Sequence, residues 1–146
     1  MKKRMLLVED NEDDIELTLR ALRKNNLENE VVVARDGEDA LHYLFQTGPH
    51  ANDGAELPEV ILLDLKLPGQ SGLDVLRTIR SNARTKLLPV VVLTSSSEDR
   101  DMVESYKLGA NSYVQKPVDF SEFLEATRQL GLYWLLLNRR PTPGSG

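Results

Sequence analysis

The sequence predicts an α/β fold, a doubly wound parallel sheet of five strands with five helices on its two faces. Three observations lead to this prediction. The chain has 146 residues, which fits one domain of ordinary size, and 40% of them are hydrophobic, which is enough for a core. Short apolar runs also alternate with longer amphipathic stretches along the chain. We assign residues 1–140 to one domain and the breaker-rich residues 141–146 to a disordered tail.

Each of the short apolar runs is expected to form a strand. Three of them consist almost entirely of β-branched residues or leucine, which is typical of strands buried on both faces of a parallel sheet. These three are the first, third and fourth runs. The predicted strands are residues 5–8, 31–34, 60–63, 89–93 and 112–114.

The stretches between the strands carry apolar residues at helical spacing. We expect Asp36 to cap the second helix, and Asp119 or Ser121 to cap the last. Residues 46–59, rich in Gly, Pro, Asn, Asp and Ala, predict a long surface loop. The predicted helices are residues 13–25, residues 36–46, a third marked by Leu73, Val75, Leu76 and Ile79, a fourth marked by Met102, Val103, Tyr106 and Leu108, and a long fifth at 119–138.

The composition excludes several classes of function. The net charge of −5 argues against a nucleic-acid partner, although a local basic patch can hide in an acidic total. The chain has no cysteine, which rules out disulfides, thiolate catalysis and cysteine zinc sites, and its two histidines are too few for a His-rich metal site. No window approaches the ~20 apolar residues of a membrane span, and the apolar run at residues 5–8 is too short for a signal peptide. We therefore expect a cytoplasmic protein without a membrane partner.

Four of the apolar runs lead directly into residues that carry chemistry. Glu9 and Asp10 follow the first run, Asp64 the third, Thr94 the fourth, and Lys116 comes just after the fifth. Ligands bind beyond the carboxyl ends of the strands in open α/β sheets, so these residues are expected to converge. Three carboxylates at one edge repel one another, and Mg²⁺ relieves such repulsion. An amine and a hydroxyl beside the metal indicate phosphoryl transfer, with one carboxylate as the nucleophile.

At this point the motifs resemble those of a known family. The pair Glu9-Asp10, Asp64 in Leu-Leu-Asp-Leu-Lys-Leu-Pro-Gly-Gln-Ser-Gly, Thr94 in Val-Leu-Thr-Ser-Ser, and Lys116-Pro117 resemble the receiver domain of two-component response regulators. The resemblance runs from Met5 to about Leu130 and implies a flavodoxin-like strand order of 2-1-3-4-5. The long loop and the aromatic last helix resemble the stand-alone receivers paired with bacterial phytochrome histidine kinases.

The resemblance implies a role for each site residue. Asp64 would be the phosphoacceptor, and Mg²⁺ would be bound by Glu9, Asp10, Asp64 and the backbone carbonyl of Lys66. Lys116 would pair with a phosphoryl oxygen, and the peptide bond before Pro117 would be cis. Thr94 would donate a hydrogen bond to the phosphoryl group, which would let Tyr113 turn inward and change the surface of helix 4, strand 5 and helix 5. Lys66 and Ser96 occupy positions that tune the lifetime of the acyl phosphate.

Two acids beside the site are left out of this assignment. Asp13 and Asp14 continue the acidic run after Asp10, but acidic residues commonly occupy a helix N-terminus for electrostatic reasons alone. We therefore treat them as part of the helix start.

The last predicted helix has apolar residues all around it. Phe123, Ala126, Leu130 and Trp134 share one face, whereas Leu132, Tyr133 and Leu136 lie off that face. A helix that is apolar all round is usually buried all round, so we expect a homodimer through Leu132, Tyr133 and Leu136. The alternative is that the long loop covers them.

Three functions remain open. The first is a receiver that takes its phosphoryl group from a sensor histidine kinase and catalyses only its own phosphorylation and dephosphorylation. With only a short tail after residue 138, its output would come from protein contacts or phosphotransfer. The second is a hydrolase or phosphomutase with an aspartate nucleophile. Such enzymes usually carry a second Asp two residues later, where this chain has Lys66. The third is a scaffold that is never phosphorylated, against which the intact Asp10, Asp64, Thr94 and Lys116 count.

Overall fold

The computed structural model describes residues 4–24, 30–52, 54, 56–95, 99–116, 121–122 and 125. Within them, strands and helices alternate as the sequence predicts, and most predicted bounds agree to within one or two residues. The predicted fifth helix, except for three of its residues, and the tail lie outside the described residues. The strands are β1 (Arg4–Val8), β2 (Glu30–Ala34), β3 (Val60–Leu63), β4 (Val90–Thr94) and β5 (Ser112–Gln115), and the helices are α1 (Glu12–Lys24), α2 (Gly37–Phe45), the 3-10 helix η1 (Gly48–His50), α3 (Gly72–Ser81) and α4 (Asp99–Lys107).

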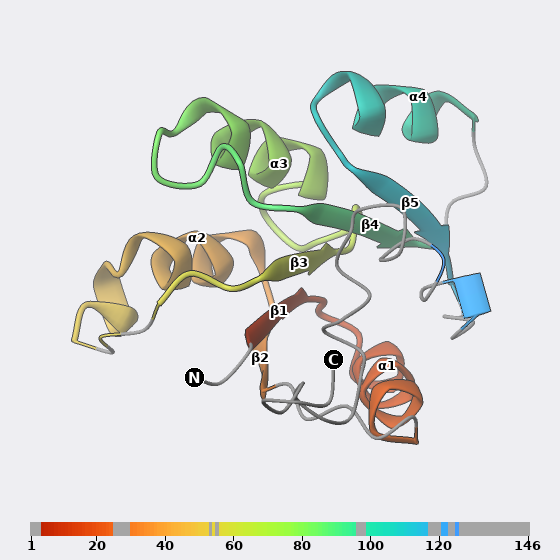
Figure 1. Ribbon diagram of the computed structural model, residues 1–146, viewed down its shortest axis with the longest axis horizontal. Helices are drawn as coiled ribbons and strands as arrows, with labels where there is room; N and C mark the ends of the chain where they lie inside the picture. Colours follow the sequence, from red (N-terminus) through yellow and green to blue (C-terminus); the bar gives the residue numbers. More distant parts are fainter. Residues whose placement is uncertain are drawn as a thin grey trace, which may run out of the picture.

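The strands form one sheet in the order β2-β1-β3-β4-β5, which confirms the predicted order. Every pairing is parallel, and the register places Leu7 of β1 between Val33 of β2 and Leu62 of β3. Helices α2 and α3 lie on one face of the sheet and α1 on the other (Figure 1). All five strands therefore direct their carboxyl ends to the same edge.

The alternation of side chains along the strands builds two cores. In β1, Leu6 and Val8 pack toward α2 and α3, whereas Met5 and Leu7 pack toward α1. All residues of β3 and β4 are buried, which explains why their sequences are unbroken apolar runs and not alternating patterns. Burying one large apolar side chain contributes about 1.5–3 kcal/mol, so each such residue of the central strands stabilises the fold.

Helix caps fix where the helices begin. The carboxylate of Asp36 accepts the backbone N–H of Asp39 at 2.7 Å, which confirms the predicted cap of α2. Two further caps were not predicted. The side chain of Asn11 accepts the N–H of Asp14 at 3.0 Å at the start of α1, and Ser71 accepts the N–H of Asp74 at 3.2 Å at the start of α3.

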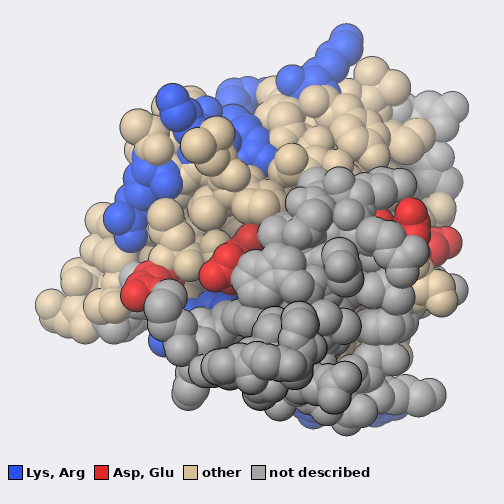
Figure 2. All heavy atoms as spheres, viewed as in Figure 1, with Lys and Arg blue, Asp and Glu red and all other residues tan. Residues whose placement is uncertain are grey.

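Basic side chains gather over α3 and the loop after it (Figure 2). Arg80, near the end of α3, makes four hydrogen bonds, all to neutral acceptors. These are the carbonyls of Lys86 (3.0 Å), Leu88 (2.7 Å) and Gly109 (2.9 Å), and the side chain of Asn111 (2.8 Å). Burial lowers the pKa of Arg80. The guanidinium thus ties the end of α3 to the loops that enter β4 and β5.

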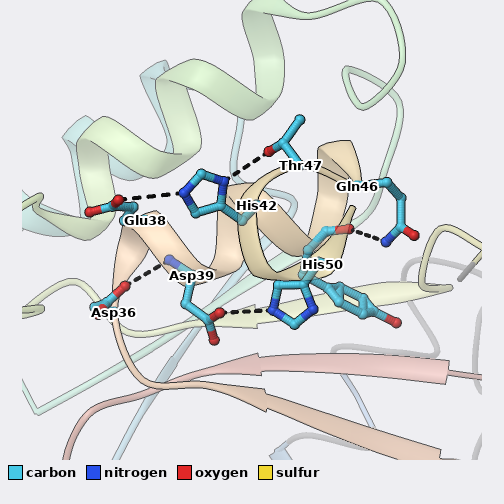
Figure 3. A network of polar contacts seen from close by, with 8 residues as sticks. Asp36, Glu38, Asp39, His42, Gln46, Thr47 and His50 are labelled. Carbon is cyan, nitrogen blue, oxygen red and sulfur yellow. Dashed lines mark hydrogen bonds and ion pairs between the residues drawn. The ribbon is translucent and has the colours of Figure 1, made fainter. Parts of the chain in front are cut away.

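The segment predicted as a long loop contains a short helix. In η1, His50 contacts Asp39 of α2 at 2.8 Å, and its ring meets that of Tyr43 edge to face at 5.5 Å (Figure 3). His42 contacts Thr47 at 2.8 Å and Glu38 at 3.4 Å. The two histidines therefore make separate polar contacts, and these contacts hold the start of the loop against α2.

Helix α4 is present as predicted, but its apolar residues do not face the sheet. Met102, Val103 and Tyr106 are 37%, 50% and 48% exposed. The fully buried side chain of α4 is Ser105, whose hydroxyl donates to the carbonyl of Asp101 at 2.8 Å. The spacing of Met102, Val103 and Tyr106 predicted the helix correctly, because these residues recur on one side of it. That side faces outward and not toward the sheet.

Among the described residues, no helix is long and apolar enough to cross a membrane.

The network around Arg80 predicts a large cost for a conservative change. Arg80→Lys replaces a planar group that reaches four acceptors with a single ammonium, and we expect a loss of about 1–3 kcal/mol in the free energy of unfolding. Arg77→Lys is the matched control, since Arg77 on the same helix makes only an exposed ion pair with Asp74, and it is expected to cost under about 0.5 kcal/mol. Urea denaturation of both variants measures the difference. Equal costs would contradict the structural role of Arg80.

Candidate functional site

Hydrogen bonds between neighbouring strands position the site residues one step past the strand ends. The N–H of Glu9 donates to the carbonyl of Ala34 at 2.9 Å, and that of Asp64 donates to the carbonyl of Val8 at 3.0 Å. The N–H of Lys116 donates to the carbonyl of Thr94 at 2.8 Å. The sheet ladder therefore continues into the site and fixes its backbone.

The ammonium of Lys116 lies among three carboxylates. Its Nζ is 2.6 Å from Oε1 of Glu9, 2.8 Å from Oδ2 of Asp14 and 3.6 Å from Oδ2 of Asp64. The side chains of Lys116, Glu9 and Asp64 are only 8%, 3% and 6% exposed. A buried charge is tolerated only where opposite charges and hydrogen bonds compensate it, and these contacts meet that requirement.

These contacts also change the pKa of Lys116. Burial alone would lower the pKa of its ammonium. Hydrogen bonds with Asp14 and Glu9 and the charges of Asp64 and Glu9 outweigh that effect, so the pKa of Lys116 lies above its usual 10.5. The group is therefore a fixed positive charge at neutral pH.

Glu9, Asp10 and Asp64 form a carboxylate cluster. Each offers one oxygen, and these oxygens lie within 4.8 Å of one another. Burial raises the pKa of Asp64 to about 7, with the charge of Glu9 and a hydrogen bond with Glu9 acting in the same direction and Lys116 and the backbone N–H of Lys66 opposing them. Glu9 and Asp64 are buried, whereas Asp10 is exposed. An all-oxygen set with excess negative charge fits a hard divalent cation.

Gly72 supports the loop that carries Asp64. A Cβ at this position would lie 2.2 Å from the carbonyl oxygen of Asp64 and 2.6 Å from Cα of Leu65. The N–H of Gly72 donates to the carbonyl of Leu65 at 2.9 Å. The start of α3 thus packs directly on the backbone of Asp64, and only glycine leaves room for that approach.

The remaining predicted site residues are placed as follows. Thr94 is fully buried at the end of β4, and Tyr113 is half-buried in β5 opposite Val92. The side chain of Lys66 is exposed, whereas its backbone N–H donates a hydrogen bond to the carboxylate of Asp64. The predictions for Ser96, Pro117, Leu132, Tyr133 and Leu136 fall outside the described residues.

Asp14 is a site residue that sequence reasoning missed. We had treated it as part of the helix start, yet its carboxylate contacts Lys116. Asn11 could have identified it, because asparagine is a good N-cap. A cap at Asn11 sets the start of α1 and places Asp14 at the third helical position, beside the strand ends.

The family follows from comparison with known proteins. The sequence model of the response regulator receiver domain matches residues 5–128. The chain belongs to this family. It is therefore a receiver domain of a two-component system, and receiver domains bind a divalent metal, in agreement with the carboxylate cluster.

Several similar proteins are response regulators, and two of them are described as phytochrome response regulators. The chain is 52% identical to the bacteriophytochrome response regulator AtBRR, with a TM-score of 0.86 over 95% of this chain and 99% of that one. It is 41% identical to the phosphorylated cyanobacterial phytochrome response regulator RcpA, with a TM-score of 0.77 over 92% and 95% of the two chains. Response regulator Rcp1 of Synechocystis is 36% identical over 91% of this chain and 89% of its own length. The Mn²⁺-bound form of Rcp1 gives a TM-score of 0.76 at 35% identity, over 96% and 99% of the chains.

The raised pKa of Asp64 predicts how stability changes with pH. Since the pKa is about 7 in the folded protein and 3.8 as the ordinary value, the folded state binds the proton more tightly. The free energy of unfolding of the metal-free protein should therefore fall as pH rises from about 4 to 7. Asp64→Asn removes this loss, and we expect it to be more stable than the wild type at pH 8 by roughly 1–4 kcal/mol.

Thermal denaturation in the presence of a chelator, at pH 5 and at pH 8, measures this effect. The advantage of Asp64→Asn should shrink at the lower pH, where the wild-type carboxyl is protonated. An excess of divalent cation should also reduce it, because the cation compensates the wild-type charge. An advantage that is the same at both pH values would contradict the assignment to Asp64.

Proposed function

We propose that this receiver accepts a phosphoryl group on Asp64 from a sensor histidine kinase with Mg²⁺ as cofactor. The observation that carries the proposal is the buried contact of Lys116 with Glu9 and Asp64. It puts a fixed positive charge beside an aspartate that is buried in a carboxylate cluster. Two similar proteins, one described in a phosphorylated form and one in a Mn²⁺-bound form, support the same chemistry.

The transfer is a displacement at phosphorus. A carboxylate oxygen of Asp64 attacks, the new O–P bond forms, and the P–N bond of the kinase phosphohistidine breaks. The electron pair of that bond leaves with the imidazole, which later takes up a proton from water. Lys116 stabilises the charge on the phosphoryl oxygens through an N⁺–H···O⁻ contact.

Glu9, Asp10 and Asp64, together with the backbone carbonyl of Lys66, would hold the cation. When bound, Mg²⁺ would neutralise the negative charge that otherwise opposes the approach of a phosphoryl donor. The raised pKa of Asp64 supports this part of the proposal, because burial and then the charge of Glu9 disfavour the ionised carboxylate, and a bound cation would favour it. In the same way, the exposed Asp10 leaves one side of the cluster open to a cation and its waters.

We propose that phosphorylation changes the surface formed by α4, β5 and the predicted last helix. Thr94 would donate a hydrogen bond to the phosphoryl group, and Tyr113 would move inward in response. Two features support this. The carbonyl of Thr94 accepts the N–H of Lys116, which places Thr94 beside the site, and Tyr113 is only half-buried, so it can become more buried. The exposed apolar residues of α4 would then belong to the surface that a partner binds.

The kinase is proposed to be a bacteriophytochrome. This rests on the similarity to AtBRR and RcpA, both described as phytochrome response regulators. An aspartate-nucleophile hydrolase is less well supported, because the residue two positions after Asp64 is Lys66, which cannot serve as the acidic group. A phosphorylation-independent scaffold would not require the buried ion pairs at Lys116. The expected cytoplasmic location and the absence of a nucleic-acid partner stay predictions.

Incubation with acetyl phosphate and Mg²⁺ tests the proposal directly. We expect one added phosphoryl group on the wild type by intact mass spectrometry, none on Asp64→Asn, and none on the wild type in a chelator. Asp74→Asn is the control, since Asp74 is an exposed acid on α3 outside the cluster. An adduct that survives Asp64→Asn would contradict the assignment of the acceptor. No adduct on any form would favour the scaffold.

We also propose a homodimer through Leu132, Tyr133 and Leu136. Its support is the sequence pattern alone, with apolar residues all around the predicted last helix.

Leu136→Glu tests the dimer, because a charge in an apolar interface is costly to bury. We expect light scattering to give the mass of a dimer for the wild type and of a monomer for the variant. Retention of the dimer by Leu136→Glu, with the fold intact by circular dichroism, would place the interface elsewhere.

A further inference from the structure

Lys116 lies closer to two of its three carboxylate neighbours than to the third. Its Nζ is within hydrogen-bonding distance of Glu9 and Asp14, at 2.6 and 2.8 Å. Asp64, the proposed acceptor, is 3.6 Å away, close enough for an ion pair but beyond a hydrogen bond. An ammonium has three N–H donors, and two of them are therefore directed to residues other than Asp64.

Asp14 is held in this position by the start of α1. Its backbone N–H is bonded to the cap residue Asn11, and the N–H of Asn11 lies 3.3 Å from Oε2 of Glu9. The carboxylate of Asp14 thus reaches Lys116 from a fixed point on the helix. It does not belong to the carboxylate cluster that fits a metal, which consists of Glu9, Asp10 and Asp64.

The two hydrogen-bonded partners of Lys116 differ in how easily they can be given up. The side chain of Glu9 is 3% exposed, so breaking its contact with Lys116 would leave a buried carboxylate without compensation. The side chain of Asp14 is 33% exposed, and water can solvate its carboxylate when Lys116 leaves. Asp14 is therefore the partner that Lys116 can exchange for a phosphoryl oxygen.

We propose that Asp14 is a positioning residue that holds Lys116 back from Asp64 in the unphosphorylated protein and so slows phosphoryl transfer to Asp64. This inference rests on the proposed function. It acts through Lys116, whose Nζ lies 2.8 Å from Asp14 and 3.6 Å from Asp64 and therefore must move toward Asp64 to bind an oxygen of the incoming phosphoryl group. The negative charge of Asp14 also remains beside a site that must admit an anionic donor.

Asp13 offers a matched control for the test. It precedes Asp14 on the same helical turn, carries the same charge and is exposed, and Lys116 makes no contact with it. Asp13→Asn and Asp14→Asn therefore change the net charge equally, but only the second releases Lys116. Asp14→Glu keeps the charge and can still reach Lys116.

The first measurement is the rate of phosphorylation by acetyl phosphate with saturating Mg²⁺, followed by intact mass spectrometry. We expect Asp14→Asn to react about three- to tenfold faster than the wild type. Asp13→Asn should stay within about twofold of the wild type, and Asp14→Glu should be closer to the wild type than to Asp14→Asn. Equal rates for Asp13→Asn and Asp14→Asn, or a slower Asp14→Asn, would overturn the proposal.

The second measurement does not depend on phosphorylation. In a crystal structure of metal-free Asp14→Asn, Nζ of Lys116 should move within hydrogen-bonding distance of Asp64. Calorimetric titration should show an Mg²⁺ affinity close to that of the wild type, because Asp14 is not a ligand. If the wild type accepts no phosphoryl group, the proposed function fails, and the crystal structure then decides the positional claim. An unchanged distance from Lys116 to Asp64 would overturn it.

Discussion

The site depends on one buried ammonium group. Lys116 places a positive charge among Glu9, Asp14 and Asp64, and without it two carboxylates that are almost fully buried would face each other uncompensated. Three carboxylates surround this one ammonium, so the negative charge is in excess, and burial together with the charge of Glu9 raises the pKa of Asp64 even with Lys116 present. This excess is what a divalent cation would balance, and it leaves the aspartate poised between a protonated and a nucleophilic form.

The sheet supplies the rigidity that this arrangement needs. The backbone of each of Glu9, Asp64 and Lys116 is hydrogen-bonded to a neighbouring strand, and strands β1, β3 and β4 are buried almost throughout. From the side of α3, Gly72 packs on the backbone of Asp64. At the opposite ends of the strands, Arg80 ties α3 to the loops that enter β4 and β5. The charged groups can therefore be held close together because the backbone cannot move apart to relieve their repulsion.

Much of this could be predicted from the sequence, because the information was local. The apolar runs of β1 and β3, the cap at Asp36 and the acids that follow the strands are each visible in a few neighbouring residues. Contacts between distant residues were missed. Asp14 contacts Lys116 across 102 positions, and Arg80 contacts Asn111 across 31. The cap at Asn11 could have located Asp14 at the start of α1, but no local pattern identifies the distant partner of either residue. The face of α4 was also beyond local reasoning, since the buried residue there is the small, polar Ser105.

The central claim is that the carboxylates around Lys116 form the site of phosphorylation. A crystal structure of the protein with Mg²⁺ and beryllofluoride, an analogue of the phosphoryl group, tests it most directly. We expect beryllium bonded to an oxygen of Asp64, the cation among Glu9, Asp10 and Asp64, and Nζ of Lys116 within hydrogen-bonding distance of a fluoride. Beryllofluoride bound elsewhere, or a cation outside this cluster, would contradict the account.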